Sequence, residues 1–138
     1  KHYQVKSSDF MPPPPPVQQP HPPIWVVGAW PSEKSMRRAL RFQGLLPNMI
    51  GTDGKAGAPA TPEDVRMLRA HITEKRGSAP YDLIVEGSTP GDDRTAAAAQ
   101  VRPWAEAGAT WWIEARWGSE ESHDDLLKRI QQGPPHID

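Results

Sequence analysis

The sequence predicts an α/β fold: about four consecutive βα units that form the C-terminal half of a (β/α)8 TIM barrel, after a proline-rich arm. Four short apolar segments cover residues 24–28, 44–48, 82–87 and 110–114, and each precedes a turn and an amphipathic helical pattern. This alternation is typical of parallel strands linked by crossover helices. A whole barrel needs about 250 residues, whereas this chain has 138 and begins with Lys1. We therefore expect the C-terminal part of a larger protein.

Residues 1–23 do not fit the repeating unit. Proline fills positions 12–16 and recurs at positions 20, 22 and 23. Because proline fixes φ and removes a backbone donor, this stretch should be an extended polyproline II arm. We interpret it as a connector, and the alternative is a ligand for an SH3 or WW domain. The chain thus divides into an arm, residues 1–23, and a half barrel, residues 24–138.

The first unit begins with the apolar run 24–27, which suits a strand that is buried on both faces. Ser32 is the predicted N-cap of the following helix, and Glu33 in its first turn complements the helix dipole. Gly44 should close this helix and open the second strand. The segment 51–60, rich in glycine and alanine, predicts a mobile loop.

The second unit has a strong helix start at Thr61 and Pro62, which combine an N-cap residue with proline at the first helical position. Val65, Leu68 and Ile72 follow at positions i, i+3 and i+7. This spacing predicts an apolar stripe that faces the core.

The third and fourth units repeat the pattern. The strand 82–87 precedes a glycine-containing acidic loop and a helix over 96–104, and the strand 110–114 precedes a final helix. Ser122 caps that helix, with Asp125 three residues on as a variant capping box. The apolar residues of this helix that we expect to face inward are Leu126, Leu127 and Ile130.

Composition excludes several classes of function. The 16 basic and 17 acidic residues give a net charge of −1. Without a basic stripe, neither nucleic acid nor an anionic membrane is an expected partner. The chain has no cysteine, and its five histidines are scattered, so no metal site is predicted.

No apolar run reaches the roughly 20 residues of a membrane helix, and no secretory signal opens the chain. We expect a cytoplasmic protein.

The first candidate site is the turn after the first strand, Gly28, Ala29 and Trp30, with Ser32 at the helix start. Backbone N–H groups at such a helix start favour a phosphate group, and small residues let the anion approach closely. The alternative is an ordinary βα turn in which glycine serves only the backbone geometry.

The second candidate is a pocket at the strand ends, where barrels bind their ligands. It would use Asn48, Glu86, Trp112 and Glu114. Two carboxylates that share a pocket can act as acid and base, although such residues also form ion pairs, for example with Arg116. Alternation sends Trp111 and Trp112 to opposite faces of their strand. One could flank a planar ligand such as a flavin ring, while core packing is the alternative.

Several segments, in order and along the whole chain, resemble the bacterial luciferase-like family of flavin-dependent monooxygenases. They are residues 2–5, 17–20, 23–31, 61–64, 85–93, 105–112 and 133–135. The resemblance implies a (β/α)8 barrel that uses FMN or a deazaflavin on a small-molecule substrate, by oxygenation or hydride transfer. It also implies a cofactor-phosphate contact at Gly28 and Ala29. Many members have two glycines there, and Ala29 departs from that pattern while remaining small.

A half barrel would expose two sheet edges and an apolar interior. We therefore expect this chain to lack oxidoreductase activity alone, and to bind the missing N-terminal half of the barrel or to form a homodimer. The competing function from another class is a non-catalytic half-barrel module that associates with itself or with a partner.

Overall fold

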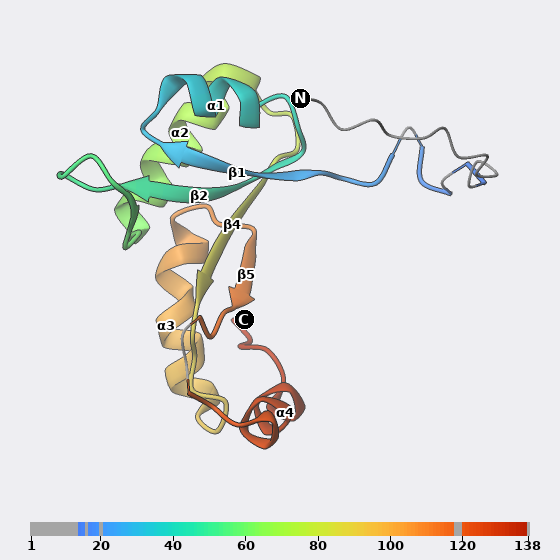
Figure 1. The fold of residues 1–138 in the computed structure, drawn as a ribbon, viewed down its shortest axis with the longest axis vertical. Helices are drawn as coiled ribbons and strands as arrows, with labels where there is room; N and C mark the ends of the chain where they lie inside the picture. Colours follow the sequence, from blue (N-terminus) through green and yellow to red (C-terminus); the bar gives the residue numbers. More distant parts are fainter. Residues whose placement is uncertain (1–13, 16, 20, 118–119, 138) are drawn as a thin grey trace, which may run out of the picture.

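The computed structural model describes residues 14–15, 17–19, 21–117 and 120–137. Its centre is a five-stranded sheet (Figure 1). Four strands run parallel and in chain order: β1 (Trp25–Trp30), β2 (Gly44–Ile50), β4 (Asp82–Gly87) and β5 (Trp111–Glu114). The short β3 (Ala56–Ala58) pairs antiparallel with the end of β2. The predicted arm falls largely outside the described residues, and its described residues form no helix or strand.

Four helices alternate with the parallel strands, as the sequence predicted. They are α1 (Glu33–Ala39), α2 (Pro62–Arg76), α3 (Arg94–Glu106) and α4 (His123–Gln132). In Figure 1, α1 and α2 lie over β1 and β2, α3 runs beside β4, and α4 lies at the far end from α1. The alternating βα organisation is therefore confirmed.

The helix starts are those that local chemistry predicts. Ser32, Thr61 and Ser122 are the N-caps of α1, α2 and α4. Thr61 forms a full capping box with Asp64, and Ser122 forms one with Asp125. Each box satisfies backbone N–H groups that the first helical turn leaves without partners.

The core lies between the sheet and the helices α1 and α2. Val65, Leu68 and Ile72 of α2 are buried, which confirms the predicted stripe. They share one apolar cluster with α1, with one residue of β2 and with alternate residues of β4. The strand and α1 members include Met36, Ala39, Leu45, Leu83 and Val85. Both helices therefore cover the same face of the sheet.

Three expectations need correction. The segment 51–60 is not loop alone, because it contains β3, which adds to β2 by backbone pairing. The helix α1 ends at Ala39, and Leu40 is its C-cap, so Gly44 does not close it. Leu126, Leu127 and Ile130 of α4 do not face inward, since Ile130 is 74% exposed and the two leucines are also exposed. Leu126 and Ile130 line an open cavity beside α3 and β5, and the buried side chain of α4 is instead Arg129.

None of the described helices is long and apolar enough to cross a membrane. Within the described residues, no group of three His, Cys, Asp or Glu side chains is placed to hold a metal ion.

Candidate functional site

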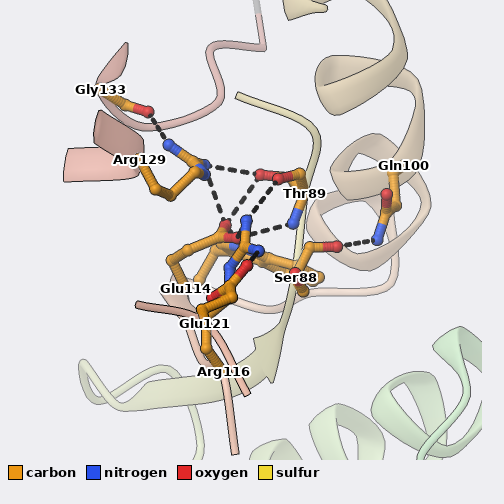
Figure 2. Close-up of polar contacts among 9 residues, drawn as sticks. Ser88, Thr89, Gln100, Glu114, Arg116, Glu121, Arg129 and Gly133 are labelled. Carbon is orange, nitrogen blue, oxygen red and sulfur yellow. Dashed lines mark hydrogen bonds and ion pairs between the residues drawn. The ribbon is translucent and has the colours of Figure 1, made fainter. Parts of the chain in front are cut away.

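Five polar residues converge where β4 and β5 end, and we call them the Glu114 cluster (Figure 2). They are Thr89, Glu114, Arg116, Glu121 and Arg129. Thr89 lies in the loop after β4, Glu114 is the last residue of β5, and Arg129 comes from α4. The cluster therefore joins three elements that are distant in sequence.

Glu114 accepts hydrogen bonds through both of its carboxylate oxygens. Its Oε1 accepts from the backbone N of Thr89 at 2.7 Å, and its Oε2 accepts from Thr89 Oγ1 at 2.8 Å. Arg129 Nη2 lies 3.1 Å from Oε2, and Trp112 Nε1 donates to it at 3.4 Å. Burial would raise the pKa of Glu114, but these hydrogen bonds and the Arg129 charge outweigh burial and hold the pKa below its ordinary value of 4.5. The carboxylate is thus ionised at neutral pH.

Arg129 is a buried cation, with 9% of its surface exposed. Its Nη2 donates to Thr89 Oγ1 at 2.9 Å, and its Nη1 donates to the carbonyl oxygen of Gly133 at 2.7 Å. A buried charge is stable only when it is paired and hydrogen-bonded. Arg129 therefore fastens α4 and its C-terminal end to the ends of β4 and β5.

Arg116 closes the cluster on the other side. Its Nη2 lies 3.5 Å from Glu114 Oε1, and its Nη1 donates to Glu121. The ion pair of Glu114 with Arg116, one of the predicted roles of Glu114, is thus present. Two arginines and two glutamates leave the cluster with no net charge, so its own carboxylates already supply the counter-charge to the guanidinium groups.

A cavity of about 700 Å³, the α4 cavity, lies between α3, β5 and α4. Its polar lining includes Thr110, Glu114, Arg116 and Arg129, and much of the rest is aromatic or aliphatic. Trp104, Trp111 and Trp112 all contribute. Its size and mixed lining are typical of a ligand pocket.

A second space of about 530 Å³, the strand-end cleft, opens where β2 and β4 separate. The two strands pair only at Gly44 with Asp82 and at Leu45 with Leu83, so their carboxyl ends are apart. Asn48 and Glu86 supply polar groups to this cleft, beside apolar side chains of β1, β2 and β4. Two of the four predicted pocket residues therefore share this cleft.

The other two predicted pocket residues, Trp112 and Glu114, line the α4 cavity. In the register of β4 and β5, Glu86 is opposite Ile113 while Glu114 is opposite Gly87. Since neighbouring residues of a strand point to opposite faces, Glu86 and Glu114 lie on opposite faces of the sheet. The structure does not bring these two carboxylates together as an acid and base pair.

The candidate phosphate turn is closely packed. A Cβ at Gly28 would lie 2.6 Å from Leu45 Cδ1, so glycine is required there by the core. The backbone N of Ala29 donates to Ser35 Oγ at 2.9 Å, and Ser32 Oγ accepts from the backbone N of Ser35. The Trp30 ring meets His71 edge-on, with 5.3 Å between centroids. The four residues of this turn therefore serve core packing and the capping of α1, and the Ala29 N–H already donates a hydrogen bond.

The two adjacent tryptophans of β5 take opposite faces, as predicted. Trp111 contacts Trp25 of β1 with ring centroids 5.1 Å apart, and Trp112 meets Trp104 of α3 at 6.2 Å. Trp25 Nε1 also donates a hydrogen bond to Asp82, and Gly44 of β2 lies between the two residues. A Cβ at Gly44 would lie 2.5 Å from the Trp25 ring, so glycine makes room for this contact. One tryptophan thus packs on the face away from the helices and the other packs under α3.

Sequence reasoning missed Thr89, Glu121 and Arg129 as members of the site. Thr89 lies in the loop after β4 and is buried where it bonds to Glu114 of β5 and to Arg129 of α4, contacts that local sequence does not predict. Arg129 is the one arginine in α4, three residues from Leu126 on the apolar side of the helix. That position is the sequence signal that could have identified it.

Comparison of the chain with protein-family models, with curated proteins and with solved structures found no match.

Proposed function

We propose that this chain is half of a (β/α)8 barrel oxidoreductase of the luciferase-like flavin-dependent class, completed by a complementary N-terminal half. The observation that carries the proposal is the sheet order β1-β2-β4-β5. A doubly wound fold reverses strand order and covers both faces of its sheet. Here the order follows the chain, and α1 and α2 cover one face. A barrel has this arrangement, with helices outside and side chains inside.

The face away from α1 and α2 supports this proposal. Trp25 and Val27 of β1, and Trp111 of β5, lie on that face and are substantially exposed. Ile84 of β4 is buried there. An apolar face that is only partly covered is what the interior of an incomplete barrel would present.

The strand-end cleft is the position that we propose for the flavin ring. Its lining is apolar except for a few groups, among them the Asn48 amide and the Glu86 carboxylate, which could orient a planar ring and a small-molecule substrate. Reduced FMN or a reduced deazaflavin would supply the electrons, and the residues of this chain would bind and position it. A phosphate group at Gly28, Ala29, Trp30 and Ser32 would compete with Ser35 Oγ for the Ala29 N–H.

A titration of FMN with the purified chain, followed by quenching of flavin fluorescence, tests this function. We expect saturable quenching, weakened about tenfold by Glu86→Leu, the equivalent of one lost hydrogen bond to a charged group. Glu106→Leu, an exposed carboxylate at the end of α3, is the matched control and should bind as the parent does. Absence of quenching, or equal loss in both variants, would reject the assignment.

The second candidate function is a non-catalytic module that associates through its apolar surface. It is favoured by the exposed apolar side chains of α4, which no described element covers. A colourless protein with a defined oligomeric state would support it over the flavin-dependent function.

A further inference from the structure

We propose that the open edge of β4 at Glu86 binds the imide edge of the flavin ring through the backbone N–H and C=O of that residue. This inference rests on the proposed function and deepens it, because it assigns the part of the ring that the strand-end cleft recognises. It starts from the point at which β2 and β4 stop pairing.

Pro47 and β3 end the ladder between β2 and β4. Asp82 N donates to the carbonyl oxygen of Gln43 at 2.9 Å, so alternate residues of β4 from Asp82 onward direct their backbone groups to β2. In the register of this ladder, the carbonyl of Ile84 would need the N–H of residue 47, and proline has none. From Met49 onward the same edge of β2 pairs with β3 instead. Beyond this point β2 and β4 diverge (Figure 1), so the carboxyl half of β4 faces the cleft.

Glu86 is the first residue of β4 whose backbone meets the open cleft. The opposite edge of β4 belongs to β5, since the carbonyl oxygens of Leu83 and Gly87 accept from backbone N–H groups at the two ends of β5. Ile84 is buried where the strands separate, whereas Glu86 is exposed and lines the cleft. Among the described strands, none pairs with Glu86 on the β2 side.

The backbone N–H and C=O of Glu86 form a donor and an acceptor side by side. Once a ligand displaces water from such groups, it must supply both hydrogen bonds, because an unpaired backbone group is costly. The imide edge of a flavin carries an N–H between two carbonyl groups. The ring N–H can donate to the Glu86 carbonyl oxygen while a ring carbonyl accepts from the Glu86 N–H. FMN and deazaflavins share this edge, so the contact fits either cofactor.

The shape of the cleft suits a planar ring. Ile84 lines it from one face of the sheet, and Val85 and Trp104 line it from the helix-covered face. A ring between the strands would therefore have apolar side chains on both of its faces. A peptide strand fits less well, because strands usually pair over three or more residues and the open edge of β4 offers little beyond Glu86.

The charge of the cleft favours the ring over the phosphate group of FMN. The Glu86 carboxylate lines the cleft, and no Lys or Arg is among the described residues around it. An anion placed there would be repelled by the carboxylate. The neutral imide edge has no such penalty, so we expect the ring to enter the cleft with the phosphate outside.

Two ring compounds without a phosphate group test the contact: lumiflavin, and lumiflavin methylated at its imide nitrogen. Methylation removes the donor that the Glu86 carbonyl would accept from. In fluorescence titrations with the purified chain, we expect the methylated ring to bind about tenfold more weakly, the equivalent of one lost hydrogen bond. Equal affinities would overturn the contact and leave flavin binding in place. If neither lumiflavin nor FMN binds, the proposed function fails and the contact fails with it.

Glu86→Leu separates the backbone of this residue from its side chain. The variant retains the backbone N–H and C=O, so it should keep the tenfold preference for the unmethylated ring whatever its overall affinity. Loss of the preference would assign the imide N–H to the carboxylate and overturn the proposal.

Nuclear magnetic resonance of the backbone amides gives a second readout. On saturation with lumiflavin, the Glu86 amide proton should shift downfield as its N–H gains an acceptor. Gly87, whose backbone faces β5, is the internal control and should shift much less. A Glu86 signal that does not move in the lumiflavin complex would also overturn the proposal.

Discussion

At the scale of single residues, Glu114 has the largest set of interactions at the strand ends. It accepts hydrogen bonds from the backbone and side chain of Thr89 and pairs with Arg129. Thr89 and Arg129 are both buried. Without Glu114, water could not replace it as their hydrogen-bond partner unless the structure changed. The carboxylate therefore links β5 to the β4–α3 loop and to α4, whether or not it touches a ligand.

Replacing Glu114 with glutamine should lower the free energy of unfolding by about 1–3 kcal/mol. The variant leaves the buried Arg129 guanidinium without its carboxylate, and unsatisfied buried charge is costly. Urea denaturation measures the change. Glu63→Gln is the control, because Glu63 pairs with Arg66 at the surface, where an ion pair contributes about 0–1 kcal/mol. Equal losses in the two variants would contradict a special role for the cluster.

The pKa of Glu114 predicts a dependence on pH. The pKa is lowered in the folded chain, so the carboxylate stabilises the fold above the unfolded value of 4.5 and loses that contribution as pH falls through the folded pKa. The stability difference between the parent and Glu114→Gln should therefore be constant near neutral pH and shrink below about pH 4.5. Urea midpoints measured from pH 7 downward check this, and a difference that grows on acidification would contradict it.

At the scale of elements, the helices differ in how firmly they are joined to the sheet. The helix α2 buries its apolar stripe against β2 and β4. The helix α4 exposes its apolar residues and is attached mainly through Arg129. Local sequence gives both helices the same start, a capping box, so any difference in their behaviour comes from packing.

Removing the two caps should therefore have different consequences. Thr61→Ala should lower the global free energy of unfolding by about 1 kcal/mol, because α2 belongs to the core. Ser122→Ala should mainly raise local opening of α4, seen as faster hydrogen exchange of its amides, with less effect on the urea midpoint. Equal global losses in the two variants would show that α4 unfolds together with the core.

At the scale of the whole molecule, the sheet has one apolar face covered by helices and one that is partly open. The polar groups of the strand-end cleft include Asn48 and Glu86, which could orient a ring but do not enclose it. Catalysis in a closed site depends on excluding water and on holding groups in fixed positions. The described strands form an open wall and not an enclosure.

We therefore predict that the purified chain does not sustain turnover of reduced flavin. Oxygen consumption with reduced FMN should equal the rate without protein, whether or not flavin fluorescence is quenched. Enzyme-free flavin and a Glu86→Leu variant serve as the controls. Turnover above the enzyme-free rate that Glu86→Leu abolishes would show that this chain is sufficient for the reaction.

The sequence by itself determined the local structure. The N-caps at Ser32, Thr61 and Ser122, the apolar stripe of α2 and the alternation of strands with helices follow from nearby residues. Only the tertiary structure decided which side chains meet. Thr89 and Arg129 are 40 residues apart and join at Glu114, and strand register placed Glu86 and Glu114 on opposite faces. The apolar residues of α4 have a helical pattern that resembles a core stripe, yet they are exposed, because a pattern specifies a face and only neighbouring elements can cover it.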